Sequence, residues 1–213
     1  MLEIYVTLLV LPVVAYLLGS IPFGLIFARL FGGKDVRKSG SGNIGATNVA
    51  RVVGNTAGVL TLICDTAKGS AAVLLAARLT EENSTWMVVA GLAALVGHCF
   101  PIWLGFRGGK GVATAAGVFV VLSPLAAAAA IVLFILVVAF WHYVSLGSIA
   151  SAAAIPFLVY LLWAPRHAPP FAVICGTFLA ALLIVWEHRG NIQRLIAREE
   201  PRFRFSRREE GKG

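Results

Sequence analysis

Long apolar stretches separated by short polar segments dominate the chain. A helix that crosses a lipid bilayer needs roughly 20 mainly apolar residues, with a range near 17 to 25. Runs of about this length or longer cover residues 2–31, 53–79, 86–106, 112–141, 146–163 and 171–187. The pattern therefore predicts an all-α fold, that of a polytopic integral membrane protein.

The composition agrees with this pattern. Of the 213 residues, 59% are hydrophobic and only 13% are charged, and the mean hydropathy is +0.85. Soluble domains carry about 25% charged residues and roughly 45–50% apolar ones, so the values argue strongly against a water-soluble globular domain. The net charge of +8 suits the exposed segments to anionic lipids or phosphorylated ligands. We expect no nucleic-acid partner.

The basic residues give the orientation, because basic loops face the cytoplasm. Three segments are markedly basic: 32–52, 107–110 and everything after residue 186. They lie on one side only if the run 112–141 folds back near Ser123 and Pro124. We therefore predict two short helices there, both lining protein or a water-filled cavity. The result is about seven transmembrane helices, with the N-terminus outside and the C-terminus in the cytoplasm.

The domain organisation is simple. The first apolar run follows no basic segment and contains no small-residue cleavage site, so we expect a retained helix and not a signal peptide. Residues 1–202 are expected to form a single transmembrane domain without an internal repeat. Residues 203–213 are expected to form a basic, mobile C-terminal tail.

A first polar cluster lies in the segment 40–48, between Lys38 and Arg51. Its glycines allow successive backbone N–H groups to converge on an anion, and its hydroxyl and amide groups supply further donors. The alternative is a flexible loop between helices. The candidate ligand-binding residues are Gly40, Ser41, Gly42, Asn43, Thr47, Asn48 and Arg51.

A second cluster joins the end of one helix to the start of the next. It consists of Arg107, Gly108, Gly109, Lys110 and Gly111. Exposed N–H donors, a favourable helix dipole and the lysine charge together suit a phosphate group. The cluster is not a Walker A motif, because a glycine follows the lysine and no strand precedes it. The alternative is a glycine-rich turn with basic membrane anchors.

A third cluster, 187–194, follows the last apolar run. On a continuing helix, His188, Asn191 and Arg194 share one face. They predict either a polar site at the cytoplasmic surface or, for the histidine, an ordinary interfacial side chain.

Two further pairs of polar residues need an explanation. Asp65 and Lys68 lie inside an apolar run, three residues apart. An unpaired charge there costs about 2.5–3.5 kcal/mol, so we favour a structural ion pair. Ser145 and Ser148 could supply hydroxyl groups to a ligand or cap a helix.

The three clusters together resemble the PlsY family, the acyl-phosphate-dependent glycerol-3-phosphate acyltransferases of the bacterial inner membrane. The resemblance extends over nearly the whole chain. It includes 40–48 with Arg51, 97–114, and the motif His188-Arg189-x-Asn191-x-x-Arg194-Leu195. One departure is visible, because Arg198 stands where the family usually has a glycine, two residues before Glu200.

The resemblance implies transfer of a fatty acyl group from acyl phosphate to the 1-hydroxyl of glycerol 3-phosphate, giving lysophosphatidic acid and phosphate. The expected partners are these two substrates and membrane lipids, for a monomer with its active site on the cytoplasmic face. No cofactor and no metal site are expected, since no cluster has the spacing of metal ligands.

The resemblance also assigns roles to residues. It implies that Ser41 and Arg51 are essential polar groups, that Lys110 is catalytic within a glycerol-phosphate loop, and that His188 and Asn191 are active residues. Glu200 matches a glutamate with a structural role. Beside those of the first cluster, the further expected substrate-binding residues are Arg107, Gly108, Gly109, Gly111 and Ser145.

The general base stays open at this point. Acyltransferases with soluble donors use a histidine followed after four residues by an aspartate, and none of the four histidines has an aspartate at that spacing. Either His188 accepts the proton or the oxygens of the acyl phosphate do; we favour the second. The rival functions are a transporter of phosphorylated solutes, which usually has a midplane site and a repeat, and a lipid-anchoring scaffold, which leaves the glycine motifs unexplained.

Overall fold

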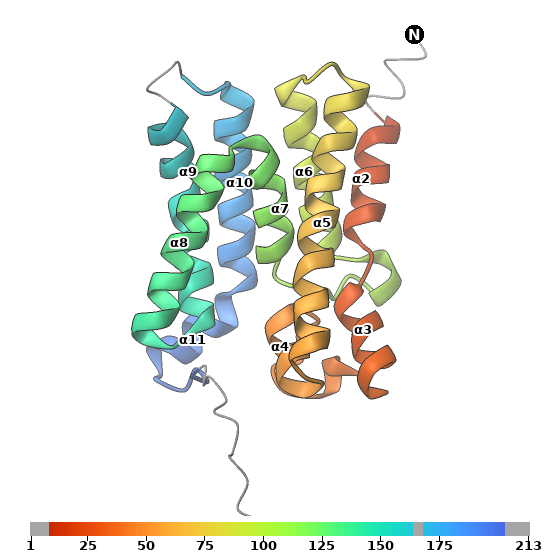
Figure 1. The fold of residues 1–213 in the computed structure, drawn as a ribbon, viewed down its shortest axis with the longest axis vertical. Helices are drawn as coiled ribbons and strands as arrows, with labels where there is room; N and C mark the ends of the chain where they lie inside the picture. The colour runs from red at the N-terminus through yellow and green to blue at the C-terminus, as the bar shows by residue number, and fades with distance from the viewer. Residues whose placement is uncertain (1–8, 164–167, 203–213) are drawn as a thin grey trace, which may run out of the picture.

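The computed structural model describes residues 9–163 and 168–202, and every regular element in these two ranges is a helix (Figure 1). Two short 3₁₀ helices, η2 (Val36–Lys38) and η3 (Ile102–Leu104), connect longer elements. The α-helices are α2 (Leu11–Gly19), α3 (Phe23–Gly32), α4 (Ala46–Val52), α5 (Asn55–Leu79), α6 (Ser84–Cys99), α7 (Val112–Leu122), α8 (Pro124–Trp141), α9 (Val144–Trp163), α10 (Phe171–Glu187) and α11 (Arg189–Ile196). The predicted all-α fold is confirmed.

The described residues contain five segments that are long and apolar enough to cross a membrane: Leu11–Gly32, Asn55–Leu79, Ser84–Leu104, Pro124–Trp141 and Val144–Trp163. A sixth candidate consists of α10 and α11, which meet at a bend of 57°. The remaining apolar helix, α7, has 11 residues and is shorter than a span.

The first apolar run is not the continuous helix that we predicted. Helix α2 ends at Gly19, and α3 begins only at Phe23. Proline has no N–H group and its ring clashes with the preceding turn, so Pro22 interrupts the backbone ladder. At this break the carbonyl of Ile21 accepts hydrogen bonds from the N–H of Phe23 at 3.1 Å and from Lys68 Nζ at 2.9 Å.

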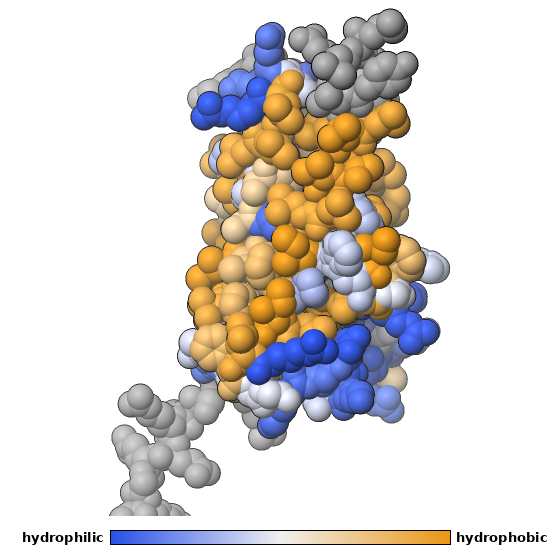
Figure 2. All heavy atoms as spheres, turned by 90° about the vertical axis from the view of Figure 1, so that its right-hand side faces the viewer, coloured by the Kyte–Doolittle hydropathy of each residue, from blue (hydrophilic) through white to orange (hydrophobic). Residues whose placement is uncertain are grey.

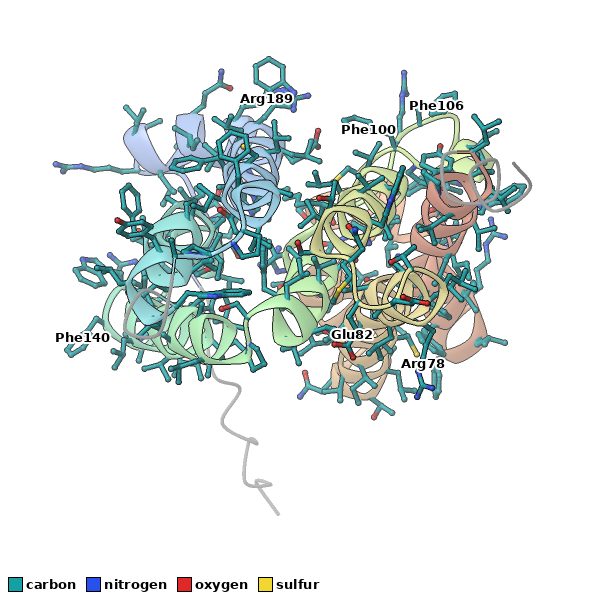
Figure 3. All side chains as sticks on the ribbon, turned by 90° about the horizontal axis from the view of Figure 1, so that it is seen from above. Arg78, Glu82, Phe100, Phe106, Phe140 and Arg189 are labelled. Atoms are coloured by element: carbon teal, nitrogen blue, oxygen red, sulfur yellow. The ribbon has the colours of Figure 1, made fainter. Side chains whose placement is uncertain are left out.

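The run 112–141 folds back at Ser123, as predicted, but its two halves differ in length. Helix α7 has 11 residues, whereas α8 has 18 and is a candidate span in its own right. The prediction that both halves are short and line protein or a cavity is wrong for α8. Leu125 and Phe140 are 63% and 74% exposed, and Figure 3 shows Phe140 pointing away from the bundle. These apolar side chains face lipid.

Helix α7 lies between two groups of helices (Figures 1 and 3). It packs against α5 on one side and α8 on the other. On the α5 side, a Cβ atom at Gly69 would collide with the backbone of Thr114, and one at Gly117 with the backbone of Thr66. Small residues allow such close approach between membrane helices. This contact fixes the position of α7 along the axis of α5, and with it the position of the loop that precedes α7.

The predicted ion pair inside the membrane is confirmed. Lys68 Nζ lies 2.8 Å from Asp65 Oδ1, and both side chains are buried. His98 Nδ1 lies 3.6 Å from the same carboxylate oxygen. Lys68 connects α5 to the break between α2 and α3. His98 connects α6 to Asp65 on α5.

Polar residues gather at both ends of the bundle. On the face shown in Figure 2, an apolar belt separates the two polar ends. Helices α4 and α11 lie at the same end (Figure 1), so the basic segments that they belong to are neighbours. The tail predicted for 203–213 lies outside the described residues.

Candidate active site

The three polar clusters meet around one cavity of about 370 Å³. The cavity lies where α11 approaches the loop before α4 and the start of α7. Its lining residues are Ser41, Gly42, Asn43, Lys110, Glu187, Arg189, Gly190, Asn191, Gln193 and Arg194. Segments about 70 residues apart in the sequence thus build one site, as the clustering of basic segments predicted.

Asn48 shapes the first loop from beneath. Its side chain is buried, and its amide nitrogen donates to the carbonyls of Val36, Ser39 and Asn43 at 3.1, 3.1 and 2.8 Å. Its amide oxygen accepts from the N–H of Ser41 at 2.9 Å. These bonds use the whole amide group, so in this structure Asn48 holds Ser41 and Asn43 at the cavity wall without facing the cavity itself.

The glycine loop before α7 is fixed by α6. The N–H groups of Gly108 and Gly109 donate to the carbonyls of Cys99 and His98, both at 3.0 Å. A Cβ atom at Gly109 would collide with the imidazole of His98. The expectation that this loop offers exposed N–H donors is therefore wrong for these two glycines. Their role is to let the loop pack on His98, which places Lys110 at the cavity.

A hydrogen-bonded chain connects Lys110 to the C-terminal segment. Lys110 Nζ donates to Asn191 Oδ1. Asn191 Nδ2 donates to Glu200 Oε1 at 2.6 Å, and Arg194 Nε donates to Glu200 Oε2 at 2.7 Å. The amide of Asn191 is thus fixed in orientation, with its oxygen toward the lysine.

The surroundings of Lys110 and Glu200, the two ends of this hydrogen-bonded series, shift their pKa values. Burial raises the pKa of Glu200, but the nearby Ser145 hydroxyl, Asn191 amide and Arg194 guanidinium outweigh burial and hold it below its usual value. Burial lowers the pKa of Lys110, and Glu200 only partly opposes this effect. The lysine therefore loses its proton at a lower pH than an exposed lysine does.

The turn after α11 has a left-handed residue, Arg198, at the position where the sequence departs from the family motif. Arg198 has a φ of 59°, a left-handed conformation that favours glycine. The N–H of Glu199 donates to the carbonyl of Arg194 at 2.8 Å and closes the turn. Glu200 can therefore fold back onto Asn191 with an arginine at position 198.

His188 lies beside the cavity, not in its wall. It is buried at the junction of α10 and α11, and its Nδ1 bonds to the carbonyl of Ile184 at 2.8 Å. Because a carbonyl can only accept, Nδ1 carries the proton. In the neutral ring Nε2 is then an acceptor.

Several predicted site residues lie outside the cavity wall. The side chains of Thr47, Arg51 and Arg107 are exposed and do not line the cavity. Gly40 lies against the Asn48 amide oxygen, and Gly111 starts α7 with a left-handed φ of 82°. Ser145 is buried near the carboxylate of Glu200.

The cavity also contains residues that were not assigned from the sequence. They are Glu187, Arg189, Gly190 and Gln193, together with Arg194, which the sequence placed only on the helix face of Asn191. A bend between α10 and α11 is needed to bring both Glu187 and Gln193 to one wall, because a straight helix spaces them differently. The sequence signal for this bend is weak.

Chemically, the cavity suits an anion with further polar groups. Lys110, Arg189 and Arg194 bring three cations to its wall, against one carboxylate, that of Glu187. Ser41, Asn43 and Gln193 add neutral donors and acceptors. Guanidinium and ammonium groups bind phosphate by charge-assisted hydrogen bonds.

Comparisons with known proteins find matches over most of the chain. A glycerol-3-phosphate acyltransferase family model matches residues 9–198. The glycerol-3-phosphate acyltransferase of Syntrophotalea carbinolica is 51% identical over 190 residues, covering 89% of this chain and 94% of that protein. The one from Geobacter sulfurreducens is 48% identical over 196 residues, covering 92% and 97%.

Two solved structures share the fold. Both are of PlsY (YgiH), described as an integral membrane glycerol 3-phosphate acyltransferase. The glycerol 3-phosphate form superimposes with a TM-score of 0.86 at 39% identity, covering 92% of this chain and 95% of that chain. The lysophosphatidic acid form gives 0.84 at 38% identity, with the same coverage.

Proposed function

The chain belongs to the glycerol-3-phosphate acyltransferase family, and from this premise we propose the details of its reaction. It is an integral membrane acyltransferase that acts on glycerol 3-phosphate in phospholipid synthesis. The proposal is that its donor is acyl phosphate and that it acylates the 1-hydroxyl, giving lysophosphatidic acid and phosphate.

The observation that carries the proposal is the convergence of Lys110, Arg189 and Arg194 on one cavity. Both substrates bear phosphate, so both need such cations. Asn191 orients Lys110, and Ser41 adds a hydroxyl to the cavity wall. The exposed apolar belt beside the cavity end (Figure 2) suits a donor whose acyl chain stays in lipid.

The reaction needs little more than positioning and charge stabilisation. The 1-hydroxyl oxygen attacks the acyl carbonyl carbon, the bond from this carbon to the phosphate oxygen breaks, and the hydroxyl proton goes to the departing phosphate. Cations fixed in place lower the barrier because they stabilise the charge that develops on the oxyanion and the phosphate. His188 is then a positioning residue at the helix bend, since it does not line the cavity.

We further propose a bacterial inner-membrane enzyme that works as a monomer. The N-terminus lies outside, and the C-terminus and the cavity lie on the cytoplasmic side. The support is the positive-inside rule: α4 and α11, which belong to two basic segments, lie at the same end of the bundle (Figure 1), and Lys110 lines the same cavity as Arg189 and Arg194.

Donor choice gives the sharpest test. Purified protein is incubated with labelled glycerol 3-phosphate and palmitoyl phosphate, palmitoyl-CoA or palmitoyl-acyl carrier protein in parallel. We expect lysophosphatidic acid from palmitoyl phosphate alone. Product from a thioester instead would show that the donor is wrong. Counterflow of labelled glycerol 3-phosphate in proteoliposomes without any donor would favour a transporter.

A further inference from the structure

Glycerol 3-phosphate presents two kinds of group to a binding cavity. Its phosphate needs positive charge and donors, which Lys110, Arg189 and Arg194 supply. Its two hydroxyl groups are donors as well, and lysine and arginine side chains accept no hydrogen bond. The hydroxyl groups therefore need an acceptor elsewhere in the cavity wall.

The two asparagine acceptors in the wall are already engaged. The side-chain oxygen of Asn191 accepts from Lys110, and that of Asn43 accepts from the N–H of Gly45 at 2.7 Å. Ser41 and Gln193 offer neutral acceptors. A hydrogen bond to an ionised acceptor is roughly twice as strong as one between neutral groups, so a carboxylate would bind a hydroxyl more tightly than either.

Glu187 is the one acidic residue among the described residues that line the cavity. It is the last residue of α10, and its side chain is only 16% exposed. Its nearest cation is Arg189, whose Nη1 is 3.8 Å from Oε1, a distance beyond a hydrogen bond. A carboxylate offers about four lone-pair sites, so Glu187 keeps free acceptor capacity.

A carboxylate in a phosphate cavity has a cost. It repels the ligand's negative charge and partly neutralises the cations that attract it. This cost is offset if the carboxylate binds another part of the ligand. The hydroxyl groups of the glycerol moiety are the donors available for that role.

We propose that Glu187 is a specificity-determining residue, which accepts a hydrogen bond from the 2-hydroxyl of glycerol 3-phosphate. The inference rests on the proposed function. In that reaction the 1-hydroxyl gives its proton to the departing phosphate, so the 2-hydroxyl is the donor that still needs a partner. Glu187 thereby selects a diol phosphate over an alkyl phosphate with a single hydroxyl.

The test compares glycerol 3-phosphate with 3-hydroxypropyl phosphate, which keeps the phosphate and the 1-hydroxyl but lacks the 2-hydroxyl. Both are measured by calorimetric Kd and by kcat/KM with palmitoyl phosphate. The proteins are the wild type, Glu187→Ala, Glu187→Gln and Glu199→Ala, the last an exposed acidic residue outside the cavity.

We expect the wild type to prefer glycerol 3-phosphate by roughly tenfold or more, the size of a hydrogen bond to a charged acceptor. In Glu187→Ala the preference falls to within about twofold. Glu187→Gln is intermediate because its amide oxygen still accepts. Glu199→Ala keeps the full preference. Arg189 is released equally for both ligands, so it does not alter the ratio.

A full preference in Glu187→Ala, or no preference in the wild type, would overturn the assignment. Equal weakening of both ligands would also overturn it, since it would show a merely structural role. If Glu187→Ala does not fold, the Gln variant decides: an unchanged ratio there contradicts the inference. A wild type that binds with this preference but does not use palmitoyl phosphate would refute the donor proposal alone.

Discussion

Among the described residues, the charged cluster inside the bundle and the one around the cavity differ in how much charge they leave unpaired. In the first, inside the bundle, Asp65, Lys68 and His98 face one another, and Lys68 also bonds to a backbone carbonyl. All three side chains are buried, and one positive charge meets one negative charge. The first cluster is therefore closed and cannot serve a ligand.

The second cluster surrounds the cavity. Lys110, Arg189 and Arg194 outnumber Glu187 and Glu200 there, and parts of them are open to solvent. Both clusters contain a lysine held by a polar partner, but only the second has positive charge to spare. The difference shows what distinguishes a binding site from a structural ion pair. Both contain paired charges, but the binding site also has unpaired positive charge that solvent and ligands can reach.

Breaking the closed cluster should have the largest effect, and it should be on stability. Asp65→Asn leaves Lys68 buried without its counter-charge, which costs about 3–5 kcal/mol. We expect a large fall in the thermal unfolding temperature in detergent, with unchanged kcat/KM for the molecules that stay folded. The double variant Asp65→Leu with Lys68→Met should recover part of the loss. Recovery of nothing would contradict a charge-based explanation.

Breaking the open cluster should affect activity and not stability. Lys110→Ala removes a cation from the cavity wall, and we expect kcat/KM to fall about 10²–10³-fold. Arg107→Ala is the matched control, because this neighbouring cation is exposed and outside the wall. It should stay near wild type. Equal losses in both variants would mean that charge in the loop matters, but not the position of Lys110.

The pH dependence of stability tests the role of Glu200 beside the cavity. Its pKa is lowered in the folded protein, so its ionised form adds stability above the ordinary pKa of a glutamate, and this stability is lost as the pH falls through the folded value. The unfolding temperature of the wild type should fall more steeply below about pH 4.5 than that of Glu200→Gln. At neutral pH we expect this variant to lose about tenfold in kcat/KM, because Asn191 is no longer held. The same pH dependence in both proteins would contradict an ionised Glu200 that accepts hydrogen bonds from Asn191 and Arg194.

The smallest effect concerns the turn that brings Glu200 back. Arg198→Gly relieves the left-handed backbone at Arg198 and should stabilise the protein by about 1 kcal/mol. The expected rise in unfolding temperature is about 2–4 °C, measured against Arg198→Ala, which keeps the strain and removes the same charge. A rise in both variants would assign the gain to charge.

Much of the fold follows from the sequence because lipid imposes simple rules. The lengths of the apolar runs predicted the helices. The distribution of basic residues correctly predicted that the run 112–141 folds back at Ser123. The break at Pro22 was missed although proline is its signal. The lipid-facing position of α8 could not be deduced, because an apolar run reads the same whether it faces lipid or protein.

The sequence indicated which segments form the site, but not which side chains line the cavity or which hydrogen bonds they make. Members of all three predicted clusters line one cavity, and Lys110 bonds to Asn191. The position of Glu187 in the cavity wall depends on the bend after α10, and the role of Asn48 depends on loop carbonyls. Such contacts join distant segments, so no local pattern in the sequence encodes them.

The most direct test of the open cluster is an experimental structure of the protein with glycerol 3-phosphate bound. We expect the phosphate within hydrogen-bond distance of Lys110 and of Arg189 or Arg194, and the glycerol carbons toward Glu187. A phosphate bound away from Lys110, for example between Arg51 and Arg107, would contradict the assignment of this cavity as the active site.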